Sequence, residues 1–376
     1  MRYRLLKHGL LGICVLLAFP SAGRAKGHQF SLKTLPSFVH QLPKATQRRI
    51  LKAVHHYAGR GDVSLVQRSS AHRSAETQLR RTAEAINRSL RKVAAERPVL
   101  IIVEGLNGAG KTSLQRRLVE DYGAFAGLDL KQAHFGAPQP VFTDKQWLDR
   151  YDEKLPSKPG EVALWDRSQI GRYIFEIDAY PQLGKKQRRS SLKQMDAFEK
   201  QLAARGIAVI KLFLVPSKQR QIERNGKRIA LQSQIDASDA AELLPKQRDK
   251  TFRRYAKVLA ATSGVFPWQI IPMGSSSEGP GRYSGNKRKR RAARKSDQEL
   301  WRSISRDLRQ AYVSITDNGS KAPRPKRDHK VIKRIADKLG MVGPLMTATE
   351  GRQLAFDTLL RTLDQQLATT RSAGEK

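Results

Sequence analysis

A glycine-rich stretch contains the residue types in this sequence that most directly suggest chemistry. It reads Gly105-Leu106-Asn107-Gly108-Ala109-Gly110-Lys111-Thr112. Glycines at this spacing let the backbone curl so that successive amide groups point at phosphate oxygens. The lysine supplies a point charge between phosphates, and the threonine hydroxyl suits Mg²⁺. The pattern predicts a Walker A phosphate-binding loop. Its expected contact residues are Gly105, Asn107, Gly108, Ala109, Gly110, Lys111 and Thr112.

Acidic and basic residues further along the chain have the types needed to complete such a site. Asp166 ends a short apolar run, and with Thr112 it is expected to hold Mg²⁺, as a Walker B acid does. Two pairs of arginines follow, and planar guanidinium groups bind phosphoryl oxygens in bidentate fashion. The second pair is also compatible with a solvated basic helix face. The predicted catalytic residues are Lys111, Asp166, Arg167, Arg172, Arg224 and Arg228.

The elements that position these residues can be read from the apolar patterns. Val99–Val103, Val162–Trp165 and Ala208–Val215 are apolar runs typical of strands buried on both faces. The glycine loop follows the first run directly, and Ser113–Tyr122 is expected to form a helix. Strand, loop and helix in that order support a phosphate site. The sequence therefore predicts an α/β fold, a kinase-like doubly wound parallel sheet with the site at the carboxyl ends of its strands.

The composition indicates a polyanionic partner. The 376 residues include 71 Lys and Arg against 34 Asp and Glu, which gives a formal net charge of +37. Such an excess favours binding to nucleic acid, an anionic membrane or polyphosphate, and composition alone does not choose among them. Residues 275–296 are rich in Gly and Ser and then strongly basic, which is typical of a flexible linker with a polyanion-binding patch. This linker is where nucleic acid is expected to bind if it binds at all.

The first 25 residues have the layout of a cleavable secretory signal. A basic start is followed by the apolar run Leu10–Phe19 and by small residues up to Ala25. The apolar run is too short to span a bilayer comfortably, so cleavage near Ala25 and a periplasmic or secreted location are expected. Cys14, the sequence's single cysteine, lies within this run. The mature chain would then have no disulfide and no thiolate ligand, and the eight histidines show no ligand spacing.

Helical segments flank the predicted core. A basic helix is expected over Ala75–Glu96, ahead of the first strand, and two helices over His329–Leu339 and Thr349–Ala368. The last two belong to an appendage, without an evident catalytic group, that covers the sheet or binds polyanion. The expected organisation is a signal peptide (1–25), a basic helical extension (26–97), the kinase-like domain (98–274), the linker (275–296) and a helical extension (297–376).

Several further segments occur in a characteristic order between Val99 and about Met273. They are Gln146-Trp147, Arg150-Tyr151, Leu155-Pro156, Gly160-Glu161, Trp165-Asp166-Arg167-Ser168 with Arg172, Phe198-Glu199, Leu202, Gly206-Ile207, Lys211, Tyr255, Thr262 and Pro267-Trp268. The ordered set resembles the second polyphosphate kinase family, P-loop phosphotransferases that use polyphosphate with nucleotides. The resemblance covers a little under half of the chain. In P-loop kinases the helix after the third strand carries lid arginines, so Arg224 and Arg228 are expected to belong to a lid.

The sequence also departs from that family. Asn107 stands where the family usually has an Asp that assists catalysis, and Gly171 replaces an Asn. Thr112-Ser113 replaces the family's glycines, and the loop taken alone resembles that of thymidylate kinase. A Trp-Lys element of the family is not evident between Leu231 and Leu244. An uncharged Asn107 can supply neither a base nor a metal charge.

Together these features predict an exported, Mg²⁺-dependent phosphotransferase that moves a phosphoryl group between polyphosphate and a nucleotide. Two alternatives stay open: an ATP-dependent nucleoside monophosphate kinase, and a non-catalytic polyanion-binding protein on a kinase scaffold. The direction of transfer, the acceptor nucleotide and the assembly, for which a homo-oligomer is one option, are left undecided by the sequence.

Overall fold

The computed structural model describes six stretches of the chain and a few residues between them. They are residues 70–136, 147–176, 185–216, 245–273, 325–341 and 348–374, with Lys44, Arg48, Gln221, Arg224, Leu300, Ser303, Ile304, Arg306, Asp307 and Leu308. The predicted signal segment (1–25), the predicted linker (275–296) and Arg228 lie outside the described residues. Among the helices that are described, none is long and apolar enough to cross a membrane.

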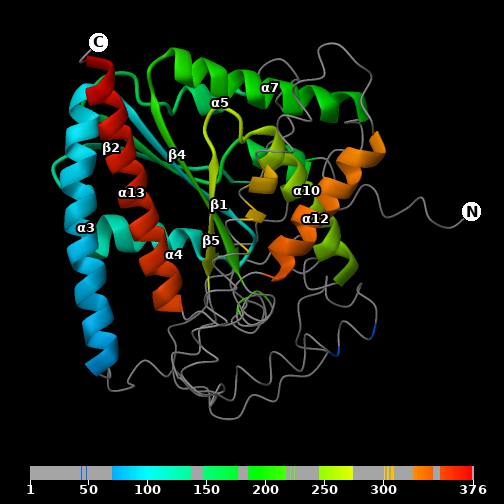
Figure 1. The fold of residues 1–376 in the computed structure, drawn as a ribbon, viewed down its shortest axis with the longest axis horizontal. Coiled ribbons are helices and arrows are strands. Elements are labelled where there is room, and N and C mark those ends of the chain that lie inside the picture. The colour runs from blue at the N-terminus through cyan, green and yellow to red at the C-terminus, as the bar shows by residue number, and fades with distance from the viewer. Residues whose placement is uncertain are drawn as a thin grey trace, which may run out of the picture.

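Five parallel strands form one sheet at the centre of this part of the chain (Figure 1). The strands are β1 (Val99–Gly105), β2 (Asp129–His134), β3 (Glu161–Asp166), β4 (Ala208–Pro216) and β5 (Trp268–Met273). Their order across the sheet is β2-β3-β1-β4-β5, and each neighbouring pair is parallel. The predicted doubly wound parallel sheet is confirmed, and β1, which leads into the glycine loop, lies in the middle.

Burial differs between the central strands and the edge strand β2. Every residue of β1, β3 and β4 is buried, as their continuous apolar runs predict. β2 has the sequence DLKQAH and is exposed or half-buried along its whole length. The other edge strand, β5, is buried at all but one residue, so the difference lies in β2 itself, where only Leu130 and Ala133 are apolar. For that reason β2 has no signal in the sequence pattern, and neither β2 nor β5 was among the strands expected above.

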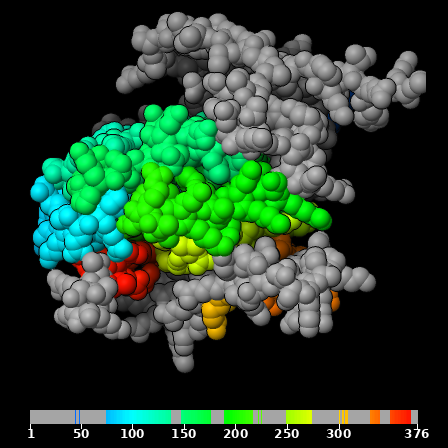
Figure 2. All heavy atoms as spheres, turned by 90° about the horizontal axis from the view of Figure 1, so that it is seen from above, coloured from blue at the N-terminus to red at the C-terminus, as the bar shows by residue number. Residues whose placement is uncertain are grey.

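One face of the sheet is covered by helices from both ends of the described chain. They are α3 (Ser70–Glu96), α4 (Lys111–Arg116) with the π-helical turn η3 (Arg117–Asp121), and α13 (Ala348–Gly374). Helices α3 and α13 lie side by side in both views (Figures 1 and 2). Buried side chains of this layer include Leu79, Ile86, Phe356 and Leu359. The helices expected over 75–96 and 349–368 are thus confirmed, whereas the helix expected over 113–122 starts at Lys111 and changes to π geometry after Arg116.

The opposite face is covered by a second layer of helices. They are α5 (Asp149–Asp152), the π-helical turn η4 (Arg172–Glu176), α7 (Lys185–Ala204), α10 (Pro245–Ala261) and α12 (Pro325–Met341). The core beneath them is rich in large rings, and Phe213 contacts both Tyr255 and Trp268 at ring-centroid distances of 5.0 and 6.1 Å. The helix expected over 329–339 corresponds to α12.

A charged pair is buried inside this second layer. The Lys211 ammonium of β4 donates to both carboxylate oxygens of Glu199 of α7, at 2.7 and 2.8 Å, and to the Thr262 carbonyl oxygen. It also lies 4.7 Å from the Trp268 ring centroid. Burial raises the pKa of Glu199 and lowers that of Lys211. Each charge is compensated by the other, so the pair fixes the position of α7 on the sheet.

Candidate phosphate-binding site

The glycine loop connects the end of β1 to the start of α4. Gly105, Gly108 and Gly110 have φ angles of 154°, 74° and 92°, in the region that favours glycine. A Cβ on Gly105 would collide with the carbonyl oxygen of Leu214 on β4. The loop is also tied to β4 by a hydrogen bond from the Leu106 amide to that oxygen, at 3.3 Å. The glycines are therefore needed for the backbone path as well as for phosphate contact.

The lysine of the loop lies along the inner side of its curve. Lys111 is 8% exposed, and its ammonium donates to the carbonyl oxygens of Gly105 and Leu106 at 2.8 and 3.3 Å. These contacts hold a positive charge at the base of the pocket. Asn107, Gly108 and Gly110 line the same pocket, and Ala109 is fully buried behind it. The structure thus brings the predicted loop residues together.

The register of the sheet sets the acidic residue beside the loop. Val103 of β1 is opposite Asp166 of β3, so the carboxylate emerges next to the start of α4. The Thr112 hydroxyl donates to Asp166 Oδ2 at 2.9 Å. Asp166 Oδ1 is buried and has no hydrogen-bond partner. A buried carboxylate oxygen without a partner, next to a threonine hydroxyl, fits an oxygen-binding cation such as Mg²⁺, and these two residues would hold it.

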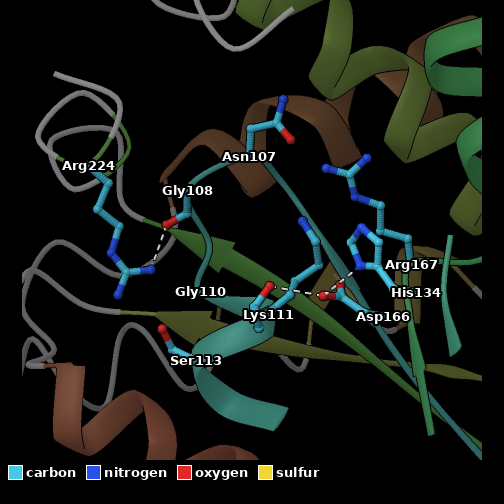
Figure 3. Close-up of a pocket in the computed structure, with 10 residues that line it drawn as sticks. Asn107, Gly108, Gly110, Lys111, Ser113, His134, Asp166, Arg167 and Arg224 are labelled. Carbon is cyan, nitrogen blue, oxygen red and sulfur yellow. Dashed lines mark hydrogen bonds and ion pairs between the residues drawn. The ribbon is translucent and has the colours of Figure 1, made fainter. Parts of the chain in front are cut away.

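A histidine that the sequence reasoning missed lies beside this carboxylate. His134 ends β2 opposite Asp166, and its Nδ1 is 3.2 Å from Asp166 Oδ2 (Figure 3). The histidines were interpreted as individual surface or core residues; His134 is an exposed residue, and it also lines the pocket. Had β2 been predicted as a strand, His134 would have been placed at a strand end, at the same edge of the sheet as Asp166. No pattern in the sequence predicted β2.

Arg167 follows Asp166 in an unusual backbone conformation. Its φ of 71° is positive, which no other non-glycine residue shows in the part of the chain that the structure describes. The Arg167 amide donates to the Val103 carbonyl oxygen at 3.0 Å. Such a conformation persists only where the surroundings fix it. It directs the guanidinium to the pocket rim, where the arginine was predicted to act.

A buried carboxylate beneath the loops supports this turn. Glu104 of β1 accepts hydrogen bonds from the Gly105 amide at 3.1 Å and from the Ser168 hydroxyl at 3.0 Å. It therefore links the glycine loop to the turn that contains Arg167. Burial raises the pKa of Glu104, while the positive charges of Lys111 and Arg167 oppose that rise.

Arg224 reaches the pocket from the other side of the loop (Figure 3). Its Nη1 donates to the Gly108 carbonyl oxygen at 2.8 Å, and a Cβ on Gly110 would collide with the same nitrogen. The guanidinium thus lies against the two glycines. Arg224, which was expected to be a lid arginine, thus contacts the glycine loop from nearly 60 positions beyond Asp166 in the sequence.

Arg172 lies elsewhere in the structure. Its guanidinium is 4.8 Å from the centroid of the Trp147 ring, and its Nε donates to the Ser191 hydroxyl at 3.4 Å. The residue is 3% exposed and does not line the pocket. Its assignment as a catalytic residue stays a prediction, and so does that of Arg228.

The assembled pocket is a cavity of about 310 Å³ at the carboxyl ends of the strands. Its lining residues are Asn107, Gly108, Gly110, Lys111, Thr112, Ser113, His134, Asp166, Arg167 and Arg224. Three cationic side chains and a curled glycine backbone converge on it, with one carboxylate at its edge. Such a set can bind a chain of phosphate groups and neutralise the charge that develops when one is transferred. The fold and site are those of the P-loop kinase class.

Comparison with known proteins assigns the chain within this class. The family described as Polyphosphate kinase 2 (PPK2) matches residues 67–275, which is more than half of the chain. The chain therefore belongs to the polyphosphate kinase 2 family. The match includes α3, the helix that precedes the sheet.

The individual proteins that match this chain have low sequence identity to it. A polyphosphate:AMP phosphotransferase of Pseudomonas syringae pv. tomato (strain ATCC BAA-871 / DC3000) is 27% identical over 130 residues, 34% of this chain and 24% of that protein. The chain thus matches about a quarter of the length of this curated relative. The crystal structure of Polyphosphate Kinase 2 from Arthrobacter aurescens TC1 has 17% identity and a TM-score of 0.44, covering 74% of this chain and 86% of that one.

Proposed function

We propose that this protein transfers a phosphoryl group between polyphosphate and a nucleotide, with Mg²⁺ as its metal. The observation that carries the proposal is the convergence of Lys111, Arg167 and Arg224 on a glycine loop beside the Thr112–Asp166 pair. Family membership supports polyphosphate as the donor or acceptor. The relative from Pseudomonas syringae, which acts on AMP, supports a nucleoside phosphate as the other substrate.

In the proposed reaction, an oxygen of the acceptor's terminal phosphate attacks the terminal phosphorus of the donor. One phosphorus–oxygen bond forms and the bridging phosphorus–oxygen bond of the donor breaks, so that its electron pair stays on the shortened chain. Lys111 binds phosphate from inside the loop, and the two arginines stabilise charge on the transferring group from either side. Bound Mg²⁺ would neutralise phosphate charge, held by Thr112 and Asp166.

Asn107 bears on how much catalysis this site can provide. It lines the pocket and is 5% exposed, but its amide can accept no proton at neutral pH. Phosphoryl transfer depends mainly on positioning and charge stabilisation, so a general base is not essential. Asn107 together with Gly171 also supports a second candidate function, a polyanion-binding protein without phosphotransferase activity.

We further propose that the protein acts outside the cytoplasm. The support is the signal-like pattern of residues 1–25 and the net charge of +37, which suits a polymeric phosphate in a compartment poor in ATP. The check is fractionation of expressing cells followed by N-terminal sequencing of the recovered protein. A new N-terminus near Lys26 in the periplasmic or secreted fraction is expected. An intact N-terminus in the cytoplasm would contradict export.

The function is tested by phosphoryl transfer with purified protein starting at Lys26. Polyphosphate and ATP are compared as donors to nucleoside mono- and diphosphates in the presence of Mg²⁺. Lys111→Ala is expected to abolish turnover and leave the circular dichroism spectrum unchanged, because the lysine ammonium donates to two loop carbonyl oxygens and belongs to no strand or buried hydrophobic cluster. Unchanged turnover in that variant would remove the loop from the mechanism.

The comparison of phosphoryl donors distinguishes the proposed function from the two alternative functions. Transfer from polyphosphate supports the proposal. Transfer from ATP alone would place the protein with the nucleoside monophosphate kinases. Binding of polyphosphate or nucleic acid without any transfer would support the polyanion-binding role.

A further inference from the structure

The solvent-facing side of α3 carries cations that the phosphate-binding pocket does not use. Arg81, Arg88 and Lys92 are exposed, and none of them lines the pocket. We propose that these three residues, the α3 cation line, form a second binding surface for the polyphosphate chain. The proposal rests on the proposed function, which supplies the polymer. It adds a place that holds the part of the polymer outside the pocket.

The three cations share one side of the helix because of their spacing. Residues seven and eleven positions apart return to the same side of an α-helix, which has about 3.6 residues per turn. At a rise of about 1.5 Å per residue, Arg81 and Lys92 are about 16 Å apart along the helix axis, with Arg88 between them. Ile86 and Leu90, on the opposite side of α3, are fully buried. The line is therefore straight and faces solvent, as the binding of a linear polyanion requires.

The α3 cation line has no partner of opposite charge in the part of the chain that the structure describes. No ion pair or side-chain hydrogen bond among the described residues involves any of its three members. Two neighbouring arginines of α3 do have partners. Arg80 lies 5.6 Å from the centroid of the Tyr122 ring, and Arg91 donates to the Ala126 carbonyl oxygen at 2.9 Å. The charges of the line are therefore the ones left available to an outside anion.

The acidic residues of α3 do not neutralise the line. Glu76 accepts hydrogen bonds from Arg117 and from the Tyr122 hydroxyl. Glu84 and Glu96 are exposed, and neither forms an ion pair with another described residue. Glu84 lies within the stretch that the cations span, so it weakens the local positive potential. Removal of its charge should strengthen the binding of an anion there.

The chemistry of this surface favours a phosphate polymer over nucleic acid. Proteins that bind single-stranded nucleic acid combine cations with aromatic rings on which the bases stack. The sequence of α3 contains no Phe, Tyr or Trp. Polyphosphate carries charge on every unit and has no base, so cations in a line are sufficient to hold it. The family to which the chain belongs supports the same polymer.

The location of α3 predicts which substrates the line affects. The helix lies at the outer side of the molecule in both views (Figures 1 and 2). Tripolyphosphate is too short to occupy both the pocket and a helix side that does not line it. A long chain can occupy both, and its second contact then forms at a high effective concentration. The line should therefore increase the affinity for long-chain polyphosphate and leave that for tripolyphosphate unchanged.

The experiment measures binding by isothermal titration calorimetry, with long-chain polyphosphate and tripolyphosphate as the two probes. The test variant replaces the whole line, by Arg81→Gln, Arg88→Gln and Lys92→Gln together. Glutamine is a good helix former, so α3 should persist, which circular dichroism checks. The matched control removes three exposed cations from the layer on the opposite face of the sheet, by Lys154→Gln, Lys193→Gln and Arg253→Gln.

The expected result differs between the two probes. The dissociation constant of the test variant for long-chain polyphosphate should rise about 10-fold at low salt, because exposed ion pairs are individually weak and three are lost. Its dissociation constant for tripolyphosphate should equal that of the wild type. The control variant should bind both probes as the wild type does, and Glu84→Gln should bind the long chain more tightly.

Four other results would overturn the proposal. They are unchanged binding of the long chain by the test variant, an equal loss in the control variant, an equal loss for tripolyphosphate, and weaker binding of duplex DNA with unchanged binding of polyphosphate. The last would assign the line to nucleic acid. Because binding is measured without turnover, the expected result in a protein that transfers no phosphoryl group would contradict the proposed function and leave this inference standing.

Discussion

Glu104 shows how much of the site depends on a residue that does not touch its pocket. It is buried, it accepts hydrogen bonds from Gly105 and Ser168, and it faces the positive charges of Lys111 and Arg167. Removal of its charge should disturb both phosphate-binding loops at once. Glu104 is in this sense a positioning residue.

For Glu104→Gln we expect kcat/KM to fall by about 10- to 100-fold, because hydrogen bonds to charged groups contribute about 1.5–3 kcal/mol. The matched variant Ser168→Ala, which removes only the bond to Oε2, should lose less. Steady-state kinetics with polyphosphate and a nucleotide would measure this, alongside thermal unfolding. Unchanged kinetics in a variant that is merely less stable would show that the carboxylate serves the fold alone.

At this scale the sequence predicted the loop well and its surroundings less well. Gly105 to Thr112, Asp166 and Arg167 were identified because their types and order carry a recognisable chemical pattern. His134 could not be, because its contact with Asp166 arises only from the pairing of β2 with β3. Arg172 was expected to act beside Arg167 on phosphoryl oxygens, yet its guanidinium lies over Trp147.

Among the elements, β2 is joined to β3 by a polar side-chain contact in addition to the backbone pairing. Glu161 at the start of β3 accepts hydrogen bonds from Lys131 of β2 at 2.8 Å and from the Ser157 amide at 2.7 Å. The bond from Lys131 and those from Ser157 lower the pKa of Glu161 from 4.5 to about 2. This carboxylate joins β2 to the core, and β2 in turn carries His134.

The lowered pKa of Glu161 determines how the stability of the fold changes with pH. The folded value lies below the ordinary one, so the ionised carboxylate stabilises the fold above about pH 4.5, and this contribution is lost as the pH falls toward 2. Denaturant unfolding of the wild type and Glu161→Gln should therefore differ at pH 7 and converge toward pH 2. Parallel pH profiles would contradict this linkage.

The elements that could be predicted are those with a strong apolar period. β1, β3 and β4 have continuous apolar runs, helices α3, α12 and α13 have apolar residues at helical spacing, and all lie where the sequence placed them. β2 lacks such a period because its environment is half solvent, and its identity as a strand comes from hydrogen bonds to β3. Strand order likewise depends on long-range pairing that no local pattern encodes.

Over the whole molecule, the sheet is stabilised by a helix beyond the family match. α13 follows residue 275, the end of that match, and packs on α3 and β5. Gly351 allows its close approach, because a Cβ there would be 2.8 Å from the Pro272 carbonyl oxygen. Phe356 is fully buried, with its ring 5.8 Å from that of Tyr122. The C-terminal helix is therefore part of the same core as the predicted kinase-like domain.

Truncation of Phe356 to alanine should lower the free energy of unfolding by about 3–5 kcal/mol, the usual effect of removing a buried ring. Chemical denaturation measures the change, and Arg361→Ala on the exposed side of α13 is the control. A loss for Phe356→Ala no larger than for the control would mean that α13 contributes little to the core.

The packing of α3 against α13 also affects how the chain folds. The Ser89 hydroxyl donates to Asp364 Oδ1 at 2.8 Å across a sequence separation of 275 residues, and Arg97 reaches Gln366 in the same way. Chains dominated by such distant contacts fold slowly, because long loops must close before the contacts form. The part of α3 that packs on α13 thus stays uncovered until α13 has been synthesised, whereas its contacts with the sheet layer can form earlier. During that interval this apolar surface is exposed to solvent, where chaperones can bind it.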